Sequence, residues 1–189
     1  MIFKDSKLVI SNIKVSVRIL AAKSDLDRWC ELEASKISTS FFTVKAQGLV
    51  FTVFYKGHVN ITSCKNKEDV ERGFSYLQEK NFIFDVELRS VDNITCTAQL
   101  TQRVFRRKTR RFGLYVQHIE NCCSEKFQRI SYRPQVFPAA FFKTKEAGTI
   151  SLFSSGKINI VGCKRYAQVL KALILFVEAV EDATSQIGQ

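Results

Sequence analysis

The sequence has few of the features of a membrane-spanning protein, an exported protein or a chain divided by Pro-rich linkers. Only two prolines occur, Pro134 and Pro138, so no Pro-rich linker divides the chain. The longest apolar run, ALILFV at 172–177, is far shorter than the ~20 residues that a membrane helix needs. The first residues include Asp5 and Lys7, where a secretory signal would be apolar. We therefore expect no membrane association and an intracellular setting with reduced thiols.

Histidine is also scarce, and the cysteines lack the spacing of a metal site. His58 and His118 are the only histidines. None of the six cysteines forms a CxxC motif that is paired with a second one or with two histidines, so we expect no zinc site and no cofactor. No recognisable nucleophile motif or catalytic constellation occurs. The sequence therefore predicts that the protein is not an enzyme.

Acidic residues are missing from three long stretches. No Asp or Glu occurs at 36–67, 93–119 or 147–177, and the formal net charge is +11 with a pI near 9.5. This balance favours an anionic partner, namely nucleic acid, a membrane surface or an acidic protein. Composition alone is equally consistent with a basic protein that has no such partner.

A dense basic segment, RVFRRKTRRFG, occupies residues 103–113 and contributes six cations between Arg103 and Arg111. Its density favours phosphate contact or nuclear import. A solvated loop is the alternative.

The hydrophobic pattern predicts nine strands and four helices. Strands are expected at 8–20, 41–47, 48–57, 58–64, 82–102, 127–134, 137–145, 148–155 and 156–163. Helices are expected at 24–35, 65–81, 114–124 and 164–182. Ser24 is the expected N-cap of the first helix, and Leu32 is expected on its apolar face. In the last helix, Leu170 and Ile174 are expected to face the core.

The chain contains the same unit twice. ISTSFF at 37–42 matches FPAAFF at 137–142, and VFYKGHVNITSCK at 53–65 matches LFSSGKINIVGCK at 152–164 after a one-residue gap. Asn12–Ile13 also matches Asn93–Ile94. We predict a first repeat at 7–81, a second at 82–182 and a short tail at 183–189.

Charge separates between the predicted elements. The carboxylates gather on the helices, whereas most of the strands have none. If the helices cover one face of a sheet, the other face is positive or neutral, as a surface that binds a polyanion requires. The low strand propensity of Asp and Glu explains part of this pattern.

Alternation along the repeated hairpin places a phenylalanine on the polar face in both repeats. Phe54 lies there with Lys56, His58 and Asn60, and Phe153 lies there with Lys157 and Asn159. An exposed Phe beside Lys and Asn indicates a contact surface, and apolar wedges inserted between base steps are one known use. Burial of both rings in a core is the alternative.

The two direct repeats, FSSGKxxxxG at 153–162 and FPAAFFK at 137–143 resemble the TATA-box-binding protein family, essentially over residues 7–182. The resemblance implies an α+β saddle. Two repeats would form a curved ten-stranded antiparallel sheet with four helices on its convex side. The concave face would bind the DNA minor groove and kink the duplex with inserted wedges.

The resemblance also implies roles for individual residues. Phe137, Phe153 and Phe54 match three intercalating Phe positions, and Ile37 replaces the fourth. Asn12, Asn93 and Thr62 match base-contacting residues. Val161 replaces a second Thr, and Asn60 and Asn159 replace Val residues that pack against the groove floor. Basic or polar phosphate contacts are expected at Lys45, Lys56, Lys143, Ser155 and Lys157.

The resemblance implies a nuclear, minor-groove DNA-binding general transcription factor. It would bend AT-rich promoter DNA and nucleate a preinitiation complex. IIB-like and IIA-like factors would bind near Ala147–Gly148 and Ala46–Gly48, respectively. The alternative is a paralogue with the same fold that acts as a scaffold for basal factors and binds DNA weakly or without sequence preference. Without DNA, the exposed Phe residues could also support a homodimer.

Overall fold

The computed structural model describes residues 8–80, 87–100 and 112–187. Ten strands form one sheet in the order β2-β3-β4-β5-β1-β6-β10-β9-β8-β7, and the pairings described in detail are antiparallel. The chain divides into two compact units. We call Ile10–Asn93 the N-terminal unit, and Ile94–Gln189 with Met1–Val9 the C-terminal unit. The predicted repeat boundary at 81–82 lies in a segment outside the described residues.

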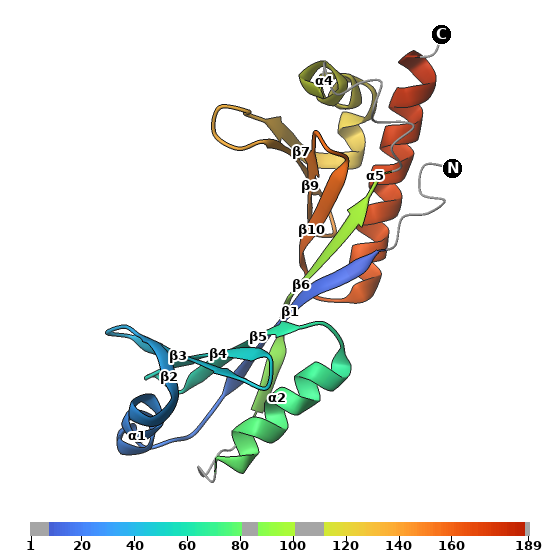
Figure 1. Ribbon diagram of the computed structural model, residues 1–189. Helices are drawn as coiled ribbons and strands as arrows, with labels where there is room; N and C mark the ends of the chain where they lie inside the picture. The colour runs from blue at the N-terminus through green and yellow to red at the C-terminus, as the bar shows by residue number, and fades with distance from the viewer. Residues whose placement is uncertain (1–7, 81–86, 101–111, 188–189) are drawn as a thin grey trace. The chain divides into compact units, whose positions relative to one another are not determined.

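The N-terminal unit contains five strands, two helices and residues 87–93 of a further strand, β6 (Glu87–Gln99). The strands are β1 (Val9–Arg18), β2 (Ala34–Ile37), β3 (Phe41–Ala46), β4 (Leu49–Phe54) and β5 (His58–Cys64). The helices are α1 (Lys23–Glu33) and α2 (Lys67–Glu79), and both lie on the same side of the strands (Figure 1). The predicted strands were confirmed in type, and β2 was missed because its four residues show no clear alternation.

The core of the N-terminal unit forms between the strands and these helices. Val15, Val17, Phe42, Phe51 and Ile61 are fully buried on the strand side. From the helices, Trp29, Leu26 and Leu77 pack into the same cluster. The ring of Trp29 meets that of Phe42 edge to face with a centroid distance of 5.6 Å.

The two helices of this unit begin in different ways. Asn66 caps α2, because its side chain accepts a hydrogen bond from the backbone N–H of Asp69 at 2.8 Å. The prediction for α1 was wrong: Ala22 is its N-cap, without a side-chain cap bond, and Ser24 lies inside the helix. Leu32 is 72% exposed, because Leu26, Trp29 and Cys30 already fill the buried side of α1.

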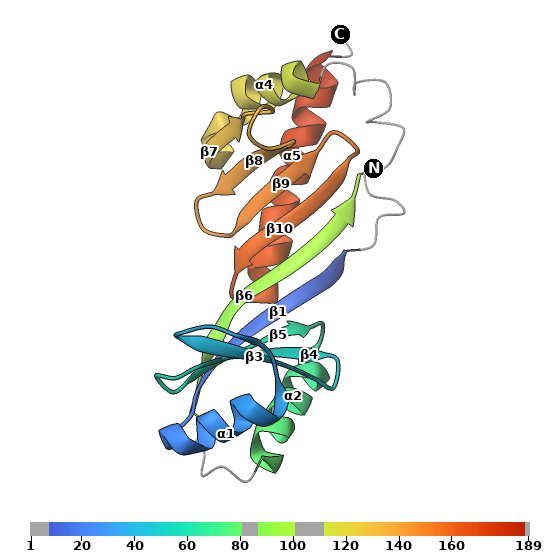
Figure 2. The ribbon, with the colours of Figure 1, turned by 60° about the vertical axis from the view of Figure 1, so that its left-hand side comes forward.

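The C-terminal unit has the matching arrangement. Its strands are β6 (Glu87–Gln99, of which residues 94–99 belong here), β7 (Phe127–Tyr132), β8 (Ala139–Thr144), β9 (Thr149–Phe153) and β10 (Lys157–Cys163). Helix α4 (Phe112–Cys123), the short 3-10 helix η2 (Ser124–Lys126) and α5 (Tyr166–Ile187) complete it. Figure 2 shows α5 running behind β8, β9 and β10; it packs on β9 and β10, and its Phe176 ring meets that of Phe142 on β8.

Helix α5 differs from the prediction in its buried face and in its length. Leu170 and Ile174 are 40% and 57% exposed, so the expectation that they face the core was wrong. The face that packs on the sheet contains three small residues, Ala172, Ala179 and Ala183, which let the helix approach closely around Phe176. The helix continues to Ile187, beyond the predicted end at 182.

Buried thiols add to the hydrophobic layer beneath the sheet. Cys64, Cys96 and Cys163 have no exposed surface, and all six cysteines are unpaired. Burial raises the pKa of Cys96 to about 11, and the neighbouring Cys163 contributes. These groups therefore stay neutral at physiological pH and act as small hydrophobes. Among the residues that the structure describes, no cluster of three His, Cys, Asp or Glu could hold a metal ion.

None of the helices in the described part of the chain is long and apolar enough to cross a membrane.

Candidate nucleic-acid interface

In both units, one face of the strands packs on helices and the other does not. Along β5, Val59 and Ile61 are fully buried, whereas Asn60 and Thr62 between them are partly exposed. In β10, Ile158 and Ile160 are buried in the same way. We call the face that bears Asn60 in the N-terminal unit, or Asn159 in the C-terminal unit, the open face. The predicted assignment of side chains to the two faces is confirmed.

Three phenylalanines cluster on the open face of the C-terminal unit. Phe137 is 43% exposed. Its ring stacks on that of Phe141 with a centroid distance of 5.4 Å and meets that of Phe153 at 6.0 Å. The turn before β8 positions Phe137, whose backbone N–H donates to the carbonyl of Arg133 at 3.0 Å. Phe137 and Phe153 are therefore partly exposed and lie outside the buried core.

The N-terminal unit carries a smaller version of this cluster. Ile37 ends β2 and is 65% exposed. Phe54 is half-buried, and its ring lies 5.7 Å from that of Phe41. Sequence reasoning missed Phe41 and its counterpart Phe141. Both precede a buried Phe in the repeated motif, so strand alternation could have placed them on the open face.

A row of polar residues crosses the open face of each unit. Asn60 lies between Thr52 of β4 and Ser16 of β1, and the Ser16 hydroxyl is 2.8 Å from Oδ1 of Asn60. Asn159 lies between Ser151 of β9 and Thr97 of β6. Its Oδ1 is buried and has no hydrogen-bond partner. Both asparagines thus occupy matching central positions in their units.

The remaining predicted base-contacting residues lie around these rows. The hydroxyl of Thr62 donates to the carbonyl of Val50 at 3.3 Å. Val161 is half-buried on β10, two residues after Asn159. Oδ1 of Asn12 accepts a hydrogen bond of 2.7 Å from the backbone N–H of Ser63, which has φ of +71°. Asn93, near the middle of β6, is also half-buried.

One carboxylate lies on the open face of the N-terminal unit, which sequence reasoning missed. Asp92 contacts the Ser16 hydroxyl, and its Oδ2 is 3.3 Å from Nζ of Lys14. Both ionic side chains are about one-third exposed, at 35% for Lys14 and 30% for Asp92. The position of Asp92 directly before Asn93 was the only signal in the sequence.

The predicted phosphate-contacting residues are exposed. Lys45, Lys143 and Lys157 lie on β3, β8 and β10 with their side chains in solvent. Ser155 lies in the turn before β10, where its Oγ accepts from the backbone N–H of Lys157 at 3.4 Å. Lys143 pairs with Arg129 of β7, which adds a second cation there.

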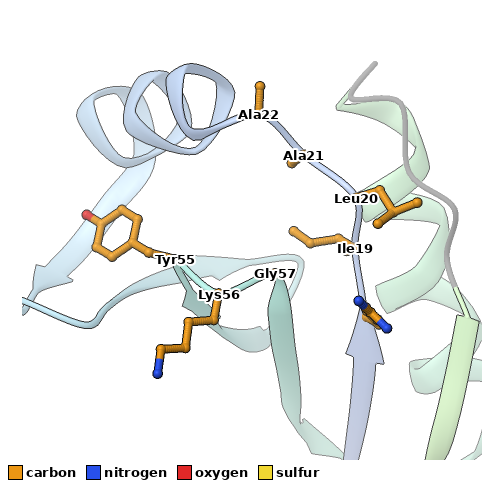
Figure 3. A pocket seen from close by; sticks show the side chains of 8 residues that line it. Ile19, Leu20, Ala21, Ala22, Tyr55, Lys56 and Gly57 are labelled. Atoms are coloured by element: carbon orange, nitrogen blue, oxygen red, sulfur yellow. The ribbon is translucent and has the colours of Figure 1, made fainter.

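Lys56 lines a shallow pocket at one end of the N-terminal unit, together with Arg18 and Tyr55. Figure 3 shows the Tyr55 ring pointing toward α1 and the Lys56 side chain extending away from it. Gly57 closes this turn at φ +81°, where a Cβ would lie 2.8 Å from the carbonyl oxygen of Ile19. The tight turn therefore holds Lys56 at the end of the hairpin that β4 and β5 form.

The structure confirms the separation of charge between helices and strands. The ten strands contain only two acidic residues, Glu87 and Asp92, both on β6. The other carboxylates of the described residues lie on helices or connecting segments. The basic segment at 103–111 lies outside the described residues.

Fold and surface together define a direct-repeat α+β protein whose open sheet face is carboxylate-poor and bears exposed aromatic rings. The family model described as "Transcription factor TFIID (or TATA-binding protein, TBP)" matches residues 89–183, just over half of the chain. The chain belongs to this family of transcription factors.

Individual relatives agree with this assignment. The TATA-box-binding protein of Thermoplasma acidophilum is 26% identical over 180 residues, which cover 89% of this chain and 91% of the relative. That of Pyrococcus furiosus is 29% identical over 177 residues, which cover 88% and 86%. The solved structure of the Methanococcus jannaschii TBP matches with a TM-score of 0.68 at 19% identity, covering 94% and 99%. The predicted fold class is confirmed, and these relatives are named as DNA-binding proteins rather than as enzymes.

Proposed function

We propose that the protein binds the minor groove of AT-rich double-stranded DNA with its open face and bends the duplex with aromatic wedges. It would act as a general transcription factor that recognises promoter DNA and nucleates a preinitiation complex. The observation that carries this proposal is the partly exposed cluster of Phe137, Phe141 and Phe153 on a carboxylate-poor sheet face. The names of the relatives, TATA-box-binding proteins, support it.

The wedge role follows from the exposure and support of the rings. A ring that is 43% exposed costs free energy in water unless a partner covers it. Phe137 is held by two further rings, so it can enter a base step without first being ordered. Unstacking a step costs a few kcal/mol, which the additional contacts to bent DNA offset. We assign Phe137 and Phe153 to one kink, and Phe54 and Ile37 to a weaker one.

Base and phosphate contacts complete the proposed interface. Amide and hydroxyl groups of Asn12, Asn93 and Thr62 would contact base edges, and Val161 would pack against the groove floor. Lys45, Lys56, Lys143, Ser155 and Lys157 would contact phosphates. Asn side chains suit the minor groove, where A·T pairs present only acceptors.

Partners and location follow from the same proposal. The hairpins near Ala46–Gly48 and Ala147–Gly148 would bind IIA-like and IIB-like factors, respectively. In the absence of DNA, the aromatic clusters could pair with those of a second copy. Nuclear localisation stays a prediction, because the curated relatives named above are archaeal.

A bending and binding titration tests the proposal. A duplex labelled at both ends would report bending by energy transfer, with an AT-rich and a GC-rich duplex of equal length compared at two salt concentrations. Tight, bent and AT-selective binding supports the proposal. Weak binding without a bend contradicts it.

A scaffold without promoter selectivity is the second candidate, and specific residues favour it. Asp92 places a carboxylate on the open face, and Ile37 offers less stacking surface than a Phe. Retention of basal factors on the immobilised protein without DNA, combined with unbent and unselective DNA binding, would favour the scaffold.

A further inference from the structure

Four side chains form a connected polar network on the open face of the N-terminal unit. Nζ of Lys14 lies 3.3 Å from Oδ2 of Asp92. The same carboxylate oxygen contacts the Ser16 hydroxyl, which is also 2.8 Å from the Asn60 amide. The network therefore runs from a cation through a carboxylate and a hydroxyl to an amide, across β1, β5 and β6.

The number of protons in this network fixes the orientation of the Asn60 amide. A hydroxyl has one proton, and an ionised carboxylate can only accept. The Asp92 carboxylate forms an ion pair with Lys14 and has no proton to donate, so Ser16 gives its proton to Asp92. With Oδ1 of Asn60 next to Ser16, two acceptors would compete for that single proton. A rotation of the amide by 180° exchanges its oxygen and nitrogen and lets the NH2 group donate to Ser16.

The carbonyl oxygen of Asn60 is then the amide atom that is available to a ligand. Asn12 has the opposite orientation, because the backbone N–H of Ser63 is a fixed donor that holds its Oδ1. Asn12 therefore offers NH2 donors, whereas Asn60 offers an acceptor. In the C-terminal unit, Oδ1 of Asn159 has no partner, so no comparable network orients that amide.

The bases present only one kind of hydrogen-bond donor in the minor groove, the 2-amino group of guanine. A·T and T·A pairs present acceptors alone. We propose that Asn60 determines sequence specificity by accepting a hydrogen bond from this amino group, so that the preferred DNA site contains a G·C pair facing Asn60. Asp92 and Ser16 are positioning residues that hold the amide in this orientation. The inference rests on the proposed binding of the minor groove by the open face.

The test begins with selection of preferred sites from a random duplex library by the full-length protein. Each G·C pair of the selected site is then replaced by inosine·cytosine, which lacks only the 2-amino group. At one position, this change should weaken binding about five- to tenfold, the effect expected for one lost hydrogen bond. Elsewhere the affinity should stay the same or rise, since the amino group obstructs the groove.

Three variants assign the effect to the network. Asn60→Val should abolish the discrimination at that position, and Asp92→Asn should reduce it, since an amide can also donate to Ser16. Asn159→Val is the matched control and should leave the discrimination unchanged. Circular dichroism and a thermal melt confirm that each variant is folded. A merely structural role for Asp92 would lower the melting temperature without changing the preference between guanine and inosine.

Two outcomes overturn the inference. The first is tight binding to a site made of A·T pairs alone, or to a site with G·C pairs whose replacement by inosine·cytosine does not lower the affinity. The second is full discrimination in the Asn60→Val variant. Absence of bent, salt-dependent binding to any duplex would instead refute the proposed function itself, so the two failures are distinguishable.

Discussion

Replacement of Phe137 by alanine separates a DNA-bending role from a structural one. Phe137 is 43% exposed, and its described ring contacts are those with Phe141 and Phe153. A Phe side chain buries about 150–250 Å² when it is fully covered. With roughly half of that area covered here and ~25 cal/mol per Å², the substitution should lower the free energy of unfolding by about 2–3 kcal/mol.

The same substitution should also weaken DNA binding. An aromatic ring stacked on a base contributes about 1–3 kcal/mol, so Phe137→Ala should weaken binding to an AT-rich duplex about 5- to 150-fold. The bend should decrease as well, because the wedge is lost at one step. A doubly labelled duplex measures both quantities, with the bend compared at saturating protein.

Phe142→Ala is the matched control, because Phe142 is adjacent to Phe141 on β8 but points to the opposite face. Its ring is fully buried and lies 5.1 Å from that of Phe176 on α5. The loss of stability should be about 3–5 kcal/mol, while the fraction that stays folded should bend DNA normally. If Phe137→Ala bent DNA as strongly as the unchanged protein, the wedge assignment would be refuted.

Three further predictions concern charge, pH and backbone geometry. Lys157→Ala should weaken binding to all duplexes and reduce the slope of log affinity against log salt by about 0.9, and an unchanged slope would exclude a phosphate contact. Burial raises the pKa of Glu33, but hydrogen bonds from Lys80 and Tyr76 outweigh this effect and lower it overall. A carboxyl whose pKa is lowered by folding stabilises the fold at pH values above its pKa in the unfolded chain, about 4.3. Glu33→Gln should therefore lower the free energy of unfolding by about 1 kcal/mol at pH 7. Urea titrations should show this difference disappearing as the pH falls through the lowered pKa, and a cost that persists there would contradict the assignment. Gly148→Ala should prevent stable folding of the C-terminal unit, because a Cβ would lie 2.0 Å from the carbonyl oxygen of Val161. Gly48→Ala, at φ +76° with open space around it, should cost only about 1 kcal/mol in the same thermal melts.

The sequence by itself determined the repeat, the strand faces and the separation of charge. Alternation is a local property of an extended chain, so Val59 and Ile61 could be assigned to the buried face without a structure. The match between FPAAFF and ISTSFF placed Phe137 and Ile37 at equivalent positions, and both are exposed. The absence of Asp and Glu from most of the predicted strands predicted the carboxylate-poor face.

Only the tertiary structure decided which side of α5 faces the sheet and which strands bring polar groups together. Apolar residues surround much of α5, so Leu170 and Ile174 could not be told from core residues until the sheet selected the alanine-rich face. Lys14 and Ser16 on β1 are far along the chain from Asn60 and Asp92. The four side chains meet through the register of β1 with β5 and the position of β6 beside β1. Cross-strand register depends on contacts between distant segments, and no local pattern could have revealed the hydrogen-bond network that orients Asn60.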